Sequence, residues 1–79
     1  MRLFEYFDRY LVDKEYKVTI RGKQIHIMNY EEIEDFSNNR VVVRYFGGVT
    51  VFLGTDLVVS KMQDDELLIT GRIKTIEYN

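Results

Sequence analysis

From residue 16 to residue 78, apolar and polar positions alternate with a period of two, which is typical of half-buried β-strands. Val18 and Ile20 begin this alternation, and after Gly22 the apolar positions move from even to odd numbers at Ile25 and Ile27. Glycine adopts a positive φ at low cost, so this change of parity predicts a tight turn or a bulge. Further strands are expected at 40–46, 49–53, 57–59, 67–71 and 73–78.

The first residues follow a different period. Between residues 2 and 12, apolar side chains recur at about 100° per residue, which predicts a short amphipathic helix with its charged residues on the other face. A helix this short is marginal in water, so its apolar face needs a surface to dock on. That face consists of Leu3, Phe4, Tyr6, Phe7, Tyr10 and Leu11.

Together these patterns predict one domain over residues 1–79, with a helix in 1–13 and a β region in 16–78. The predicted fold is all-β, with six or seven short antiparallel strands that form a curled sheet, a small barrel or a sandwich. The strands are expected to turn at glycines such as Gly22, Gly54 and Gly71. The acidic segment 30–36 is either one helical turn or an irregular edge strand.

The pair Gly47-Gly48 is the strongest hairpin signal, because both central residues of a type I′ turn need a positive φ. A turn there would place Phe46 opposite Val49 and Val43 opposite Phe52. Both faces of this hairpin are then apolar, whereas an ordinary antiparallel sheet keeps one face in water. We expect the faces to be covered either by the helix and the curled sheet, or by a partner. The candidate interface residues are Phe4, Phe7, Tyr10, Leu11, Val42, Phe46, Val49, Val51 and Leu53.

Composition points to association and away from disulfides and structural zinc. A chain of 79 residues buries about 60% of its unfolded surface, so its core is small. Domains of this size are usually reinforced by a disulfide, a metal or a partner. There is no cysteine and one histidine, which leaves a homo-oligomer or another partner as the expected reinforcement.

Motifs for enzyme chemistry are missing. His26 has no cysteine or serine at a recognisable catalytic spacing and is interpreted as a surface or cross-strand residue. The acidic clusters in 31–35 and 64–66 lack the spacing of a calcium loop and are interpreted as solvated turns. No glycine motif for phosphate binding is present. We therefore expect no catalysis, no cofactor, no metal and no small-molecule substrate.

The net charge of −2 argues against a protein whose main role is to bind nucleic acid. Basic residues nevertheless recur on the expected strands and tyrosines lie near them, so a small β-barrel that binds RNA or single-stranded DNA is the alternative. We expect no N-terminal signal peptide, because charges occur early in the sequence, and no apolar run is long enough to span a bilayer. The expected location is the cytoplasm, which the absence of cysteine fits.

Three segments resemble a known family when their order and spacing are taken together. The first runs from Val18 to Asn29 and continues to Ile33 and Phe36, the second is 49–59, and the third is 67–78. Each consists of a strand, a glycine and a second apolar alternation. In this order they resemble the YabP/YqfC family of sporulation proteins over about residues 16–78. The branch within that family stays open.

The resemblance implies a non-enzymatic sporulation accessory protein of endospore-forming Firmicutes, acting in the mother cell. It also implies action beside a sporulation membrane protein. Together with the apolar 41–53 hairpin and the apolar helix face, this predicts self-association, docking to that membrane protein, or both. The expected place is the mother-cell cytoplasm or the periphery of the forespore outer membrane. No catalytic residues are carried over from the family.

Overall fold

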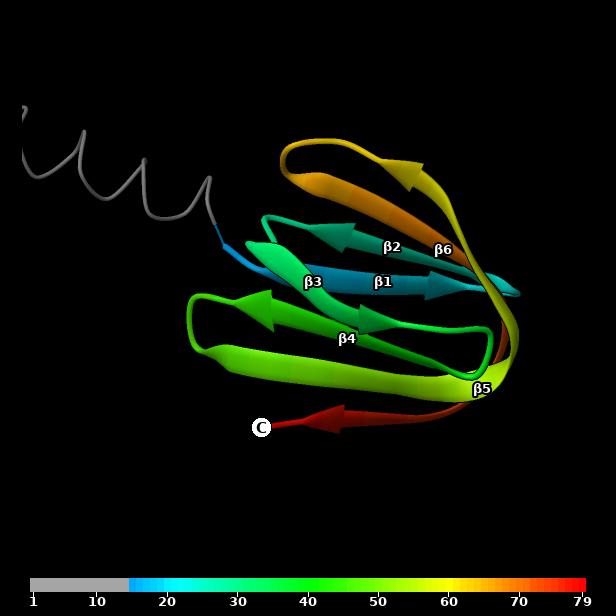
Figure 1. The fold of residues 1–79 in the computed structure, drawn as a ribbon. Coiled ribbons are helices and arrows are strands. Elements are labelled where there is room, and N and C mark those ends of the chain that lie inside the picture. The colour runs from blue at the N-terminus through cyan, green and yellow to red at the C-terminus, as the bar shows by residue number, and fades with distance from the viewer. Residues whose placement is uncertain (1–14) are drawn as a thin grey trace, which may run out of the picture.

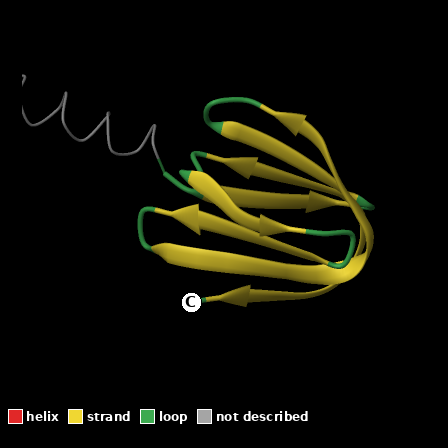
Figure 2. Ribbon diagram, viewed as in Figure 1, coloured by secondary structure: helices red, strands yellow, loops and turns green. Residues whose placement is uncertain are grey.

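A computed structural model describes residues 15–79. These residues form six strands joined by turns, with no helix among them (Figures 1 and 2). The strands are β1 (Lys17–Arg21), β2 (Gln24–Met28), β3 (Glu32–Phe36), β4 (Arg40–Tyr45), β5 (Gly48–Met62) and β6 (Glu66–Tyr78). The all-β prediction is confirmed, whereas the helix predicted for residues 2–12 lies outside the described residues.

All six strands belong to one antiparallel sheet in the order β1-β2-β6-β5-β4-β3. β5 and β6, of 15 and 13 residues, bend together near their middles, so that the sheet folds over on itself (Figure 1). β1 and β3 remain as its two edges, and the sheet does not close. Of the predicted forms, the closed barrel is therefore wrong. Segment 30–36 contains the irregular edge strand rather than the helical turn.

Two glycines allow the bend. A Cβ at Gly54 would lie 2.0 Å from the carbonyl oxygen of Arg72, and one at Gly71 would lie 2.6 Å from that of Asp56. Gly71 also has a φ of +138°, which other residues rarely adopt. The β5–β6 pairing shifts register here, so both glycines lie in bulges within continuous strands. The turns predicted at these two positions are therefore wrong.

The hairpin turns at the bend accept hydrogen bonds from these two glycines. The N–H of Gly54 donates to the carbonyl of Asn39 at 3.1 Å, in the turn between β3 and β4. The N–H of Gly71 donates to the carbonyl of Lys23 at 3.0 Å, in the turn between β1 and β2. Buried backbone donors need such partners, so the two turns stabilise the bend.

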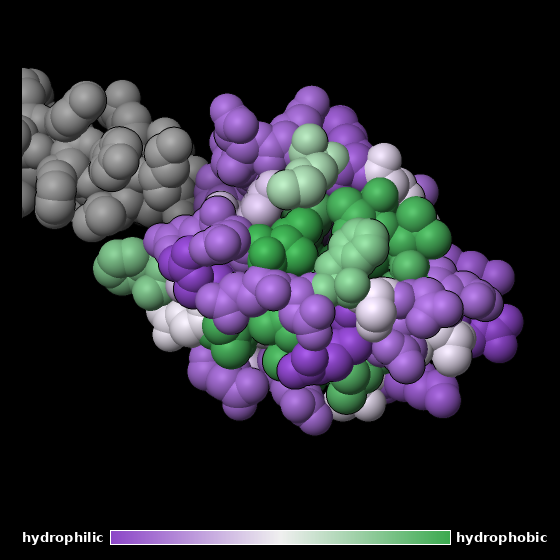
Figure 3. Space-filling view, viewed as in Figure 1, coloured by the Kyte–Doolittle hydropathy of each residue, from purple (hydrophilic) through white to green (hydrophobic). Residues whose placement is uncertain are grey.

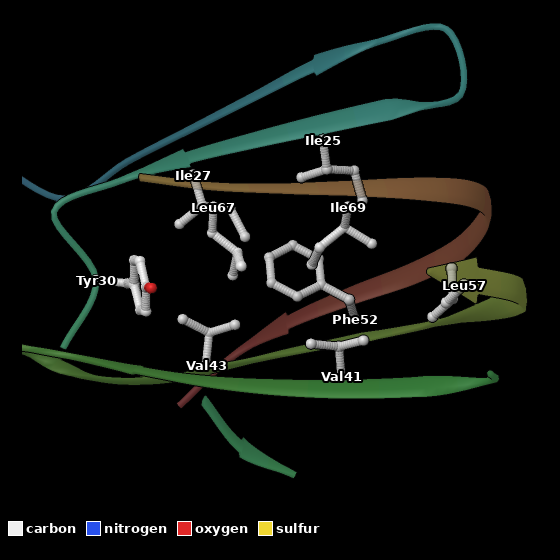
Figure 4. Close-up of a cluster of buried hydrophobic side chains, with 9 residues drawn as sticks. All are labelled: Ile25, Ile27, Tyr30, Val41, Val43, Phe52, Leu57, Leu67 and Ile69. Carbon is white, nitrogen blue, oxygen red and sulfur yellow. The ribbon is translucent and has the colours of Figure 1, made fainter. Parts of the chain in front are cut away.

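The core lies between the two halves of the bent sheet (Figure 4). Phe52 of β5 is fully buried and faces β2 and the first part of β6, and burying such a side chain contributes about 1.5–3 kcal/mol. Tyr30 closes one end, and its hydroxyl donates to the carbonyl of Gln63 at 2.6 Å. The buried cluster consists of Ile25, Ile27, Tyr30, Val41, Val43, Phe52, Leu57, Leu67 and Ile69.

We expect Gly54→Ala to lower the free energy of unfolding by about 3 kcal/mol or more. Overpacking in a core costs about 1–3 kcal/mol, and here the new methyl group meets backbone that cannot move aside. Gly22→Asn is the matched control, because Gly22 has a φ of +59° and open space around it, and asparagine tolerates this conformation. Urea unfolding of both variants measures the difference, and equal stabilities would contradict the role assigned to Gly54.

Candidate functional site

The hairpin formed by β4 and β5 contains the described part of the predicted interface. Its turn consists of Phe46 and Gly47, and Tyr45 pairs with Gly48, so the turn predicted at Gly47-Gly48 is wrong by one residue. Gly48 belongs instead to β5, where the backbone of Asn79 approaches so closely that a Cβ at Gly48 would lie 2.0 Å from its carbonyl oxygen. Because the turn lies one residue earlier than predicted, each residue of β4 faces a residue of β5 that is two positions away from the predicted one. Side chains alternate with a period of two, so every side chain stays on its predicted face.

The predicted interface residues of this hairpin differ widely in exposure. Val42 and Val51 are buried at 7% and 8% exposure, although they lie on the outer face of the bent sheet. Val49 and Leu53 are half-buried on the same face. Phe46, at the tip of the turn, is 93% exposed. The other predicted residues, Phe4, Phe7, Tyr10 and Leu11, lie outside the described part of the chain.

Arg44 occupies the outer face beside these valines and binds three carboxylates. Its Nη1 lies 2.5 Å from Oε1 of Glu31, its Nε lies 3.1 Å from Oε2 of Glu34, and its Nη2 contacts Glu32. The hydrogen bond that Arg44 donates to Glu32 raises the pKa of Arg44 above its ordinary value. Arg44 pairs directly with Val49 across the two strands, so this ion-paired group lies on the apolar outer face.

The sequence interpretation missed this cluster. The carboxylates of residues 31–35 were expected to be solvated, but on and beside edge strand β3 they pair with the arginines of β4. Asp35 also binds Nη1 of Arg40 at 2.6 Å. The signal was present in the sequence: a polar turn at 37–39 joins an acidic stretch to a strand with Arg40 and Arg44 four residues apart.

An aromatic group fixes the base of the hairpin tip. The rings of Tyr16 and Tyr45 are stacked, with centroids 4.0 Å apart and planes 7° from parallel. The Tyr16 hydroxyl donates to Oγ1 of Thr50 at 2.9 Å, and Thr50 is fully buried. Burial raises the pKa of Tyr16. The tip that presents Phe46 is therefore held by packing and hydrogen bonds just behind it.

A second group of polar side chains lies on the outer face of β1, β2 and β6. Nε2 of His26 is 2.5 Å from Oε2 of Glu66, and Nζ of Lys61 is 3.8 Å from the other carboxylate oxygen. The hydrogen bond from His26 lowers the pKa of Glu66. The cross-strand position predicted for His26 is confirmed, since it faces Leu68 of β6. These groups border a shallow hollow of about 390 Å³, also lined by Thr19, Arg21, Gln24 and Leu68.

Within residues 15–79, no group of three or more histidine, cysteine, aspartate or glutamate side chains is placed to hold a metal ion. In the same part of the chain, no helix has the length and apolar character needed to cross a membrane.

Comparison with known proteins gave one match. The family model described as the YabP family matches residues 12–79, which is most of the chain and includes every strand of the sheet. No curated protein and no solved structure matched.

We expect Arg44→Ala to lower the thermal midpoint, because Glu31, Glu32 and Glu34 would repel one another without the guanidinium. Glu32→Gln should lower the midpoint in the wild-type chain but raise it in the Arg44→Ala chain. Calorimetry measures both midpoints. The change of sign would show that Arg44 neutralises the neighbouring carboxylates. Arg72→Ala is the control, since Arg72 is exposed and makes no ion pair within residues 15–79. The same sign in both backgrounds would contradict the assignment.

The hydrogen-bonded pair of His26 and Glu66 predicts a loss of folding stability in acid. The pKa of Glu66 is lowered in the folded state, so its contribution is complete above the unfolded pKa of about 4.3 and is lost as the pH falls through the lower, folded value. Glu66→Gln should therefore flatten the dependence of the free energy of unfolding on pH in this acid window. His26→Phe should flatten it in the same way, because it removes the main cause of the shift. Urea unfolding from about pH 3 to pH 6 tests both variants, and an unchanged profile would contradict the pair's role.

Proposed function

Because this chain belongs to the YabP family, whose members are associated with sporulation, we propose that it is a non-enzymatic sporulation accessory protein. It acts in the mother cell by binding other protein molecules, either further copies of itself or a membrane-protein partner. Family membership supports the sporulation-related role. The binding of other protein molecules and the mother-cell compartment are proposed in addition.

The observation that carries the proposal is the exposure of Phe46. A phenylalanine that is 93% exposed at the tip of a hairpin buries almost none of its apolar area against residues 15–79. Aromatic side chains of this kind are the usual anchors of protein–protein interfaces, since they bury a large apolar area in a partner's pocket.

The strands behind the tip are held together by side-chain packing and hydrogen bonds. Behind it, the stacked rings of Tyr16 and Tyr45 and the hydrogen bond to Thr50 fix the strands. Val49 and Asn79 exchange two backbone hydrogen bonds, at 3.0 and 2.8 Å, which attach the end of the chain to β5. Strands that are already fixed lose little backbone entropy when the tip binds, which favours affinity.

The proposed interaction takes place in the mother-cell cytoplasm or at the periphery of the forespore outer membrane. The absence of cysteine suits a reducing compartment. A membrane-protein partner would then be bound through its exposed domain or tail, with Phe46 as the anchor.

The nucleic-acid alternative is less well supported by the side-chain arrangement. Single-strand binding needs aromatic faces open to bases beside basic groups. Tyr16 and Tyr45 stack on each other, and Arg40 and Arg44 bind carboxylates. It remains a prediction, tested by titration with oligonucleotides at low salt.

We expect Phe46→Ser to abolish function without unfolding the chain. Its free energy of unfolding should stay within about 0.5 kcal/mol of wild type, since the side chain contacts mainly water. Introduced into sporulating cells that lack the wild-type gene, it should fail to restore sporulation. Met62→Ser is the matched control, because Met62 is 63% exposed at another turn and should restore it. Full restoration by Phe46→Ser would contradict the proposal.

A further inference from the structure

The sheet ends in two strands whose outer sides have no partner in the described residues. β1 and β3 are terminal in the strand order, and no Cα atom of one lies within 8 Å of a Cα atom of the other. An edge strand presents a row of backbone N–H and C=O groups that a strand of another chain can pair with.

The two edges carry opposite charge. Residues 16–28 contain Lys17, Arg21 and Lys23 and no acidic residue, and these three make no ion pair within the described chain. The β3 edge contains the four carboxylates of residues 31–35, and Arg40 and Arg44 neutralise two of those charges. β1 therefore has a net charge of +2, with Lys23 in the adjoining turn, and the β3 edge has a net charge of −2.

Apolar side chains at both edges are only partly covered and remain exposed to solvent. Ile20 pairs with Ile25 and Phe36 pairs with Val41, so both point toward the interior of the bent sheet. Ile20 is nevertheless 52% exposed and Phe36 is 56% exposed, because the sheet ends beside them. Figure 3 shows hydrophobic side chains gathered over β1 and β3 with hydrophilic ones around them. Each edge thus offers uncovered apolar area as well as charge.

The strand directions suit a particular pairing. Six strands that are all antiparallel to their neighbours leave β1 and β3 running in opposite directions across the sheet. A second copy that places its β3 beside β1 in the same orientation therefore continues the antiparallel sheet. Lys17 and Arg21 then lie on the same outer face as Glu32 of that copy, while Ile20 and Phe36 share the inner face.

We infer that the chain assembles head to tail, with the basic edge β1 of one copy paired to the acidic edge β3 of the next. The inference rests on the self-association in the proposed function and names its surface. Pairing of two β1 edges, or of two β3 edges, would bring like charges together, which is unfavourable across strands. Each added copy again exposes one basic and one acidic edge, so the contact generates either a closed ring or an open filament of several copies.

The contact is short and is therefore expected to be weak. Each edge strand has five residues, and β3 contains a bulge between Ile33 and Asp35. Bulges and charges on edge strands normally prevent uncontrolled pairing. In this chain, opposite charges on the two edges prevent pairing of like edges while favouring the pairing of unlike ones.

Two charge-reversed variants test the inference by sedimentation and light scattering. Lys17→Glu/Arg21→Glu makes both edges acidic, and Glu32→Lys/Glu34→Lys makes both edges basic, while Glu31 still pairs with Arg44 and Asp35 with Arg40. Circular dichroism confirms that both variants are folded. Each alone should remain a monomer, and an equimolar mixture should associate, because every unlike pair of edges is again available between the two variants.

The wild-type chain should reach an average mass of about twice the monomer or more at high concentration, since each head-to-tail contact leaves an edge for a further copy. That mass should fall when salt is raised from about 0.05 to 0.5 M, because salt screens the edge charges. A wild-type monomer at low salt would overturn the inference, and so would a mixture that stays monomeric while the wild type associates. If the mixture stays monomeric and Phe46→Ser abolishes the association of the wild type, the chain self-associates through Phe46. The proposed function would then stand, and only the pairing of β1 with β3 would be rejected.

Discussion

The close approach of β5 and β6 at their common bend is the constraint on which the rest of this structure depends. Gly54 and Gly71 bring backbone against backbone at distances that leave no room for a side chain. The bend turns one six-stranded sheet into two facing halves, and Phe52 and the aliphatic residues around it become a core. Without it, the sheet would present the same side chains to water on an open face.

The alternation of apolar residues was sufficient to predict which segments are extended and the faces of their side chains, although β5 and β6 were each predicted as two shorter strands. Val41 and Val43 point inward and Val42 outward, as their spacing requires, even though the predicted turn is one residue away from the observed one. Parity survives such an error because a displacement of two residues does not move a side chain to the other face.

The remaining features depend on contacts between distant residues, which no local pattern contains. Gly54 and Gly71 have the same sequence signature as turn glycines, and only the partner strand shows that they permit a close crossing. The carboxylates beside Arg44 looked like solvated acids because their pairing is set by the β3–β4 register. In the candidate site, Phe46 was chosen for its apolar character, but its exposure follows from a turn whose position was predicted wrongly.

The pairing of β2 with β6 determines when this protein can fold. His26 and Glu66, which meet across it, are 40 residues apart in the chain, whereas the β1–β2 and β4–β5 hairpins join neighbouring segments. Ile25 and Ile27 acquire their core partners Leu67 and Ile69 only when this late strand arrives. During synthesis, the early hairpins therefore leave the ribosome with their apolar faces uncovered. The nascent chain passes through an interval in which chaperone binding competes with aggregation, and it ends only when β6 has emerged.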